Sequence, residues 1–164
     1  SAGPFNKPTE MVPSPSGDLY VSDGYRNSPV HRFSKNGSLI SSWGNPGKEA
    51  PGEFHLPHSL WVGPVGTVYV CDRENSRVQV FTAEGKFVSQ WRDIKKPTDI
   101  WFNKQQVAYV SEQRPSISIL ERTGKVLARF DTPGSGHGLW VDSHGDIYLA
   151  EAGGKRLTKY VHKH

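Results

Sequence analysis

The chain has 164 residues, with 20 Lys and Arg against 16 Asp and Glu, so its formal net charge is +4. The charges are spread along the chain and the basic C-terminal residues are most simply a solvated face, so nucleic acid is not an expected partner. No apolar run approaches the roughly 20 residues of a membrane-spanning helix, and the N-terminus lacks the apolar core of a signal peptide. A single cysteine, Cys71, excludes an intramolecular disulfide and a Cys-rich zinc module. These features favour one soluble domain with no membrane partner, and they leave its compartment open.

Short strand-like runs recur at a regular interval along the chain, between turns that carry glycine. Four segments align around a tyrosine, at positions 20, 69, 109 and 148, which gives spacings of 49, 40 and 39 residues. Each segment is preceded by an opening run, such as 57–61, and followed by a third run, such as 78–81. After the first three units come a turn and a fourth run, which ends at Trp43, Trp91 and Phe130. Alternating β-branched and aromatic residues between such turns predict short strands joined by hairpins.

Four strands per unit at a period near 40 residues are typical of a propeller blade. We therefore predict an all-β fold, a β-propeller segment of four repeated four-stranded blades. The blades are expected over about residues 5–45, 54–93, 94–131 and 134–164, after an N-terminal tail or cloning remnant at residues 1–4. A plain β-sandwich is the structural alternative, although its strands need not repeat one another.

The fourth unit ends after its third strand, which raises the question of how the propeller closes. An open array of blades leaves apolar faces and unpaired strand edges at its two ends, and such ends favour association. Three arrangements stay open: the chain is a piece of a larger ring, it completes a ring with a second copy, or it closes with four blades. We therefore expect the chain to associate with itself, as a homodimer or a higher oligomer.

Several motifs within residues 5–90 are more distinctive than generic blade patterns. They are Phe5-Asn6-Lys7-Pro8-Thr9, Val21-Ser22-Asp23-Gly24-Tyr25-Arg26-Asn27-Ser28, Pro51-Gly52-Glu53-Phe54, Leu56-Pro57-His58-Ser59-Leu60 and Asp72-Arg73-Glu74-Asn75-Ser76-Arg77. Through these motifs the repeats resemble the NHL family, and in particular the lyase domain of the peptidylglycine α-amidating enzymes. The resemblance implies a six-bladed propeller that splits a peptidyl-α-hydroxyglycine into a peptide amide and glyoxylate. It also implies a secretory, extracellular or periplasmic setting.

The resemblance further implies a zinc site on the propeller axis with three histidine ligands. Two have counterparts here, His58 in Leu-Pro-His-Ser-Leu and His137 in Gly-His-Gly-Leu-Trp, and the third falls in a blade that would precede Ser1. The residues agree with this assignment, because both histidines open the first strand of their blades, which lines the central channel of a propeller. Zinc in proteins usually needs three or four ligands. The structural alternative for each is a histidine that hydrogen-bonds across the channel.

By the same resemblance, Tyr25 is the base that takes the hydroxyl proton, and Arg73 orients the substrate carboxylate or stabilises charge at the zinc. Positive charge beside a tyrosine favours its phenolate form, and a metal polarises a hydroxyl oxygen. A second family arginine belongs to the same N-terminal portion as the third histidine. Gly138 stands where the family has the aspartate of a calcium site, and Arg26 stands where it has a disulfide cysteine. Both departures argue against calcium and against that bridge.

Simpler structural roles are the alternative for the conspicuous residues. Tyr25 would then be an exposed loop tyrosine, and Arg73 the partner of Asp72 or Glu74 in a surface ion pair. We expect the acidic residue that recurs once per blade to hydrogen-bond loops, the five tryptophans to pack between blades, and Cys71 to be a small buried hydrophobe. The histidines without a motif are treated as non-ligands: His31, His55, His144, His162 and His164.

The sequence leaves two classes of function open. The first is a zinc-dependent amidating-lyase-like enzyme or enzyme remnant, whose site is incomplete or is completed by an oligomer. If two chains closed about a common axis, His58 and His137 of each copy would supply four imidazoles. The second class is a non-catalytic NHL scaffold that binds a protein, a peptide, a sugar or, less in keeping with the charge pattern, RNA, since a propeller fold does not decide function.

Overall fold

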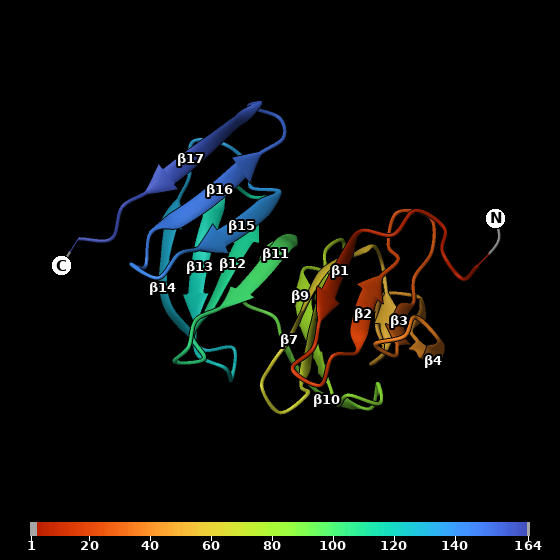
Figure 1. The fold of residues 1–164 in the computed structure, drawn as a ribbon. Coiled ribbons are helices and arrows are strands. Elements are labelled where there is room, and N and C mark those ends of the chain that lie inside the picture. The colour runs from red at the N-terminus through yellow and green to blue at the C-terminus, as the bar shows by residue number, and fades with distance from the viewer. Residues whose placement is uncertain (1–2, 164) are drawn as a thin grey trace.

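The computed structural model describes residues 3–163, so Ser1 and Ala2 of the predicted tail and His164, one of the predicted non-ligand histidines, lie outside the described residues. Within this range the chain forms four antiparallel sheets and one short two-stranded parallel sheet, without a helix. The sheets follow one another along the chain and splay around a common centre (Figure 1). The predicted all-β propeller with four blades is confirmed.

Each of the first three blades contains four strands in sequence order, and the fourth contains three among residues 3–163. Blade 1 consists of β1 (Glu10–Pro13), β2 (Leu19–Ser22), β3 (Val30–Phe33) and β4 (Leu39–Trp43). Blade 2 consists of β7 (Pro57–Val62), β8 (Val68–Asp72), β9 (Arg77–Phe81) and β10 (Phe87–Trp91). Blade 3 consists of β11 (Pro97–Phe102), β12 (Ala108–Glu112), β13 (Ser116–Leu120) and β14 (Val126–Asp131). Blade 4 consists of β15 (Gly138–Val141), β16 (Ile147–Glu151) and β17 (Arg156–Tyr160), while β5 (Asn45–Pro46) and β6 (Glu53–Phe54) pair in the connection between blades 1 and 2.

The turns between first and second strands repeat the same chemistry in every blade. The last turn residue has a left-handed backbone and donates its N–H to the carbonyl three residues earlier, as in Gly66 N to Gly63 O at 3.0 Å. Glycine takes this conformation without a steric penalty, which explains the recurrent Gly in the sequence repeat. In blade 3 Gln106 occupies the position with φ +61°. The turn is therefore conserved in geometry across blades even where its residue changes.

The hydrophobic core is divided into three clusters, one between each pair of consecutive blades. The first cluster joins blades 1 and 2 around Tyr20 and Phe81, the second joins blades 2 and 3 around Tyr69 and Phe102, and the third joins blades 3 and 4 around Leu149. The innermost strands pack in series, β1 on β7, β7 on β11 and β11 on β15. Side chains alternate between the two faces of each blade, so one blade contributes to two clusters.

All five tryptophans contact a neighbouring blade, as predicted, although Trp140 does so while largely exposed. Trp43, Trp61, Trp91 and Trp101 belong to the inter-blade clusters or pack against them. Trp140 of β15 meets Trp101 of blade 3 edge to face, with ring centroids 5.6 Å apart, and its side chain is 58% exposed.

One further structural prediction is confirmed in full and another for three of its four residues. Cys71 is fully buried in the cluster between blades 2 and 3, and its burial raises the pKa of the thiol. Three of the recurrent acidic residues, Asp23, Asp72 and Glu112, accept hydrogen bonds from loop N–H groups as predicted. The fourth, Glu151, accepts from side chains of the neighbouring strand β17 instead.

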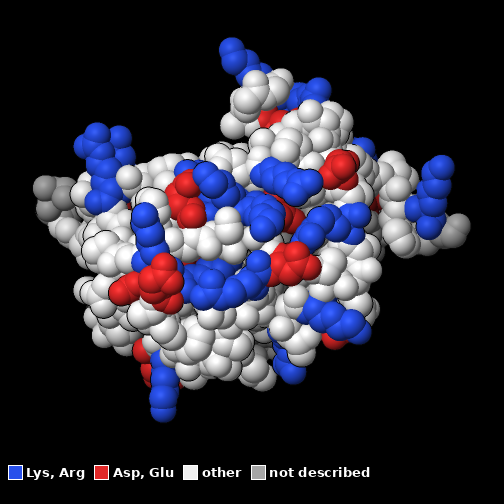
Figure 2. Space-filling view, turned by 180° about the vertical axis from the view of Figure 1, so that it is seen from behind, with Lys and Arg blue, Asp and Glu red and all other residues white. Residues whose placement is uncertain are grey.

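The surface carries both charge signs in close alternation. On the face shown in Figure 2, Lys and Arg atoms lie directly beside Asp and Glu atoms. No helix long and apolar enough to span a membrane occurs in residues 3–163.

Candidate functional site

The four blades place alternating threonine and histidine at the same position on the inner strands. Thr9, His58, Thr98 and His137 each lie where the first strand of a blade begins. Thr9 Oγ1 donates to Pro57 O at 2.7 Å, and Thr98 Oγ1 donates to Gly136 O at 3.0 Å. Each threonine hydroxyl thus holds the backbone of the residue that precedes the next histidine. The hydroxyls couple blade 1 to blade 2 and blade 3 to blade 4 at the site.

His58 is held in a single tautomer by the neighbouring blade. Its side chain is buried, and Nδ1 lies 2.6 Å from the carbonyl oxygen of Thr98. A carbonyl oxygen only accepts, so Nδ1 carries the proton and Nε2 presents its lone pair. Burial, together with the nearby His137 and Arg73, lowers the pKa of His58 to about 4, so the ring is neutral at pH 7. A neutral imidazole with a fixed tautomer is the form that ligates metals.

Tyr25 reaches the axis because its loop touches the backbone of blade 2. The loop follows β2, and a Cβ at Gly24 would lie 2.2 Å from Pro57 O, so only glycine fits there. Asp23 braces the loop, because its Oδ2 accepts from Asn6 N at 2.7 Å and from Asn27 Nδ2 at 2.9 Å. Within the Ser-Asp-Gly-Tyr motif, Asp23 and Gly24 therefore position the tyrosine that follows them.

The structure brings Tyr25, His58 and His137 together from three different blades. Tyr25 Oη lies 3.1 Å from Nε2 of His58 and 3.2 Å from Nε2 of His137. The two imidazole rings meet edge to face, with centroids 4.6 Å apart. Because Nε2 of His58 is an acceptor, the phenol donates its proton to that atom and accepts from His137. Tyr25 is 45% exposed, so the group is open to ligands from one face.

Arg73 lies beside this group without bonding to it. Its Nε donates to Glu74 Oε1 at 3.0 Å, and Glu74 in turn pairs with Lys96 at 2.8 Å. Its charge nevertheless contributes to lowering the pKa of His58. The backbone N–H of Arg73 donates to Leu56 O at 3.2 Å, which fixes the Asp-Arg-Glu-Asn loop next to the start of β7. A cation at this place could pair with an anionic group bound over the histidines.

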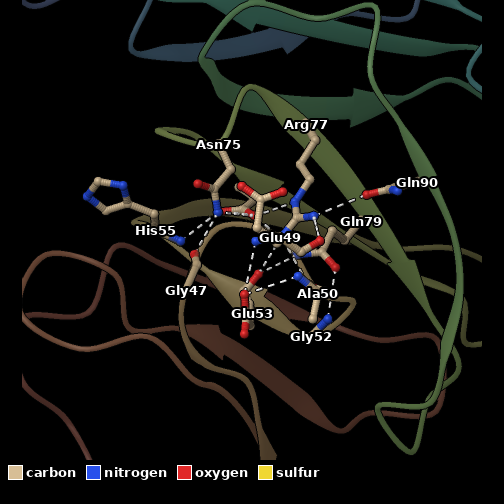
Figure 3. A network of polar contacts seen from close by, with 11 residues as sticks. Gly47, Glu49, Ala50, Gly52, Glu53, His55, Asn75, Arg77, Gln79 and Gln90 are labelled. Atoms are coloured by element: carbon tan, nitrogen blue, oxygen red, sulfur yellow. Dashed lines mark hydrogen bonds and ion pairs between the residues drawn. The ribbon is translucent and has the colours of Figure 1, made fainter.

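A buried polar network holds the segment that precedes His58 (Figure 3). Arg77 and Asp72 are both inaccessible to solvent and pair at 2.7 Å. The Arg77 guanidinium also donates to the carbonyls of Glu49, Ala50 and Glu53, and the Asp72 carboxylate accepts from His55 N at 2.8 Å. Because the network ties side chains to loop backbone, it makes the 47–55 loop part of the rigid body of blade 2.

The central channel below the histidines contains a carboxylate pair. Glu10 of β1 and Asp99 of β11 line a cavity of about 330 Å³ together with residues of β7 and β15. Asp99 accepts from Ser59 Oγ at 2.7 Å and from Leu139 N at 2.6 Å, so it links three inner strands. Burial raises the pKa of both carboxyls, and the proximity of Asp99 contributes to raising that of Glu10 to about 7.

The donor set at the axis fits part of a zinc site. Two imidazole Nε2 atoms and one phenol oxygen converge, and the tautomer of His58 is already the ligating one. Within residues 3–163 no group of three or more His, Cys, Asp or Glu side chains gathers to complete a coordination sphere. His58 and His137 would therefore be two of the three or four ligands that zinc requires.

One repeat model and two known proteins match this sequence. An NHL repeat model matches residues 54–81. Peptidyl-glycine alpha-amidating monooxygenase A of Xenopus laevis is 45% identical over 92 residues, which cover 52% of this chain and 10% of that protein. Peptidyl-alpha-hydroxyglycine alpha-amidating lyase 1 of Drosophila melanogaster is 28% identical over 196 residues, which cover 97% of this chain and 36% of that protein. The chain is a β-propeller that contains one match to the NHL repeat, and its sequence is similar to proteins named as amidating enzymes.

The matched regions span 10% and 36% of the lengths of those two relatives. The solved structure of a streptogramin B lyase superposes with a TM-score of 0.75 over 98% of this chain and 56% of that one, at 18% identity. At that identity the likeness concerns the fold alone.

Two positioning residues of the propeller site were missed by the sequence analysis. Thr9 and Thr98 follow proline in Pro8-Thr9 and Pro97-Thr98, just as His58 follows Pro57. An alignment of the opening runs of the blades therefore places Thr9 and Thr98 at the position of His58, although a threonine at that position is not by itself a ligand. The bonds that Thr98 makes to both histidine-bearing blades depend on the curvature of the blade array, which the alignment does not report.

Proposed function

We propose that this chain contributes the zinc-binding and proton-transfer part of a peptidyl-α-hydroxyglycine amidating-lyase site. One observation carries the proposal: Tyr25 Oη lies within hydrogen-bond distance of Nε2 of both His58 and His137. A phenol, two converging imidazoles and an adjacent arginine are a suitable set for binding and deprotonating a hydroxy acid. The sequence relationship to the fly lyase supports the same assignment.

In this proposal His58 and His137 hold zinc through their Nε2 atoms, and Tyr25 is the base. Bound zinc supplies a Lewis acid that polarises the substrate hydroxyl. In its phenolate form, Tyr25 Oη would remove the hydroxyl proton as the carbonyl of glyoxylate forms. The C–N bond would break with its electron pair on nitrogen, and the nitrogen would take the abstracted proton back from Tyr25 Oη and leave as the peptide amide. Arg73 orients the substrate carboxylate through its guanidinium. The carbonyl of Thr98 fixes the tautomer of His58 by accepting from Nδ1, and burial keeps the ring neutral.

The direct test is glyoxylate release from a peptide that ends in α-hydroxyglycine, with zinc-loaded protein. Tyr25→Phe should abolish release, whereas Tyr109→Phe, a half-buried tyrosine that contacts Trp101 in blade 3, should leave it unchanged. Equal release by both variants would rule out Tyr25 as the base. No release by the unmodified chain would rule out catalysis by this chain alone.

A non-catalytic NHL scaffold is the second candidate function. It is favoured by the presence of only two imidazoles in the axial group of residues 3–163. Under this function a protein or peptide binds the same open face, and His58→Ala and Tyr25→Phe leave that binding intact. RNA is a weaker candidate, because Figure 2 shows acidic atoms between the basic ones on the face it displays.

We also propose that the missing ligands come from another blade array, such as a second copy of the chain. The exposed apolar residues of the terminal blades support this, with Met11 61%, Trp140 58% and Leu157 67% exposed. Zinc bound only by the assembled form would strengthen association. Native mass spectrometry with and without zinc should show a zinc-dependent oligomer. A chelator that leaves the oligomer and its melting point unchanged would refute the link.

A further inference from the structure

A second hollow opens directly beside Tyr25, on the side away from the channel. This cleft, of about 480 Å³, lies between the Tyr25 loop and the connection that precedes β7. Clefts of roughly 300–1,000 Å³ are typical of small-ligand sites. Tyr25 lines the cleft while its hydroxyl touches both histidines. A molecule whose reactive end lies at Tyr25 Oη therefore has this cleft immediately available for its next group.

The outer wall of the cleft is rigid before any ligand arrives. Gly47 accepts from Asn75 Nδ2 at 3.0 Å, and the buried Arg77 donates to the loop carbonyls that follow (Figure 3). Leu56 has a left-handed backbone, with φ +66°, which is strained for a branched side chain. Its carbonyl is held by the N–H of Arg73. A preformed wall lowers the entropic cost of binding.

The cleft has cationic rims and no acidic lining. Arg26 lies on the Tyr25 loop and Lys48 lies on the opposite wall, and both side chains are exposed. No Asp or Glu lines the cleft, and neither cation takes part in any ion pair formed within residues 3–163. Glu53, on the same connection as Lys48, turns its carboxylate to the backbone N–H groups of Glu49 and Ala50. Two exposed cationic residues, one from each wall, therefore line this cleft.

We propose that this cleft binds the residue preceding the hydroxyglycine and selects peptides with an acidic side chain there over those with a basic one. The proposal rests on the proposed function, because it takes Tyr25 as the point where the hydroxyglycine lies. Pro46, Phe54 and Leu56 supply apolar wall for the methylene groups of such a side chain, while Arg26 and Lys48 meet its carboxylate. The substrate class of the site is then peptides with an acidic penultimate residue.

The test compares three fluorescein-labelled peptides that end in Glu-Gly, Ala-Gly and Lys-Gly. These peptides lack the hydroxyl and cannot be cleaved, so anisotropy measures binding independently of turnover. Two exposed ion pairs predict that the zinc-loaded protein binds the Glu-Gly peptide about tenfold more tightly than the Lys-Gly peptide. The double variant Arg26→Glu and Lys48→Glu should reverse the order. The matched control, Lys35→Glu and Lys86→Glu, changes the net charge equally at exposed turn positions outside the cleft and should keep the original order.

Each result of the peptide-binding experiment either supports or overturns the proposed selectivity of the cleft. Equal affinity for the three peptides, or a preference that both double variants change alike, overturns the cleft as the selecting element. Failure of every peptide to bind overturns it as well. A preference for Glu-Gly that only the cleft variant reverses supports it, even if the protein releases no glyoxylate. That last pattern would overturn the lyase proposal alone.

Discussion

Gly24→Ala should pull Tyr25 away from both histidines. The new Cβ would lie 2.2 Å from Pro57 O and 2.9 Å from Pro57 C, whereas ordinary contacts begin near 3.4 Å. Because the obstacle is backbone, the Tyr25 loop and β7 must separate by about 1 Å, and overpacking of this kind costs roughly 1–3 kcal/mol. The same movement lengthens the 3.1 Å contact of Tyr25 Oη with His58 beyond hydrogen-bond range, which removes about 1 kcal/mol more.

Two measurements follow the effect of Gly24→Ala. For a domain of this size, the melting temperature should fall by roughly 5–10 °C. In nitrogen NMR of the imidazoles, His58 Nε2 should shift as it does in Tyr25→Phe, since both variants remove the phenol proton from that atom. Gly153→Ala is the matched control, because nothing lies within 4 Å of a Cβ there and its φ is not left-handed. If Gly24→Ala has the same melting temperature as the control and leaves the chemical shift of His58 Nε2 unchanged, the close contact between Gly24 and Pro57 does not position Tyr25.

Three further predictions follow from the buried charges. In the metal-free protein His58 should titrate at about 4, so stability should decline by up to about 3 kcal/mol as the pH falls from 6.5 to 4; titration by NMR near 6.5 would contradict this. The pKa of Glu10 is raised to about 7, so stability should fall as the pH rises from 4.5 to 7, and Glu10→Gln should stabilise the fold by about 1 kcal/mol at pH 8.5 but not at pH 5 in urea unfolding. An equal change in stability at both pH values would show that the charge of Glu10 is not the cause. Arg77→Met should cost roughly 3–5 kcal/mol because it leaves the Asp72 carboxylate buried and unpaired, whereas Lys125→Met, in the exposed pair with Glu121, should cost under about 1 kcal/mol; similar losses would refute the network.

The blade architecture was predictable because short local sequence patterns determine its strands and turns, and these patterns repeat in every blade. Each tyrosine-centred strand, each left-handed turn and each alternating run could be identified from a few adjacent residues. Trp140 shows the limit of this reasoning. The repeat predicts its contact with the neighbouring blade, at Trp101, but it does not predict how much of the side chain is covered, and 58% of Trp140 is exposed.

The candidate site was predictable in its residues and not in its geometry. The sequence motifs alone identified Tyr25, His58, Arg73 and His137 as candidate site residues. The structure brings the tyrosine and the two histidines into contact. The roles assigned to them stay predictions. The tautomer of His58 depends on a carbonyl 40 residues away, at Thr98, and such a bond arises only when the curvature of consecutive blades is known.

The central claim is that His58 and His137 form a zinc site beside Tyr25. Calorimetric titration of zinc into the metal-free protein, compared with the double variant His58→Ala and His137→Ala, tests it most directly. His144→Ala and His162→Ala together are the matched control, because both residues are exposed, lie in the turn after β15 and after β17, and line a different pocket from Tyr25. The account predicts stoichiometric zinc binding by the unmodified protein and the control, with none by the axial variant. Equal zinc binding by all three proteins, or none by the unmodified protein, would contradict it.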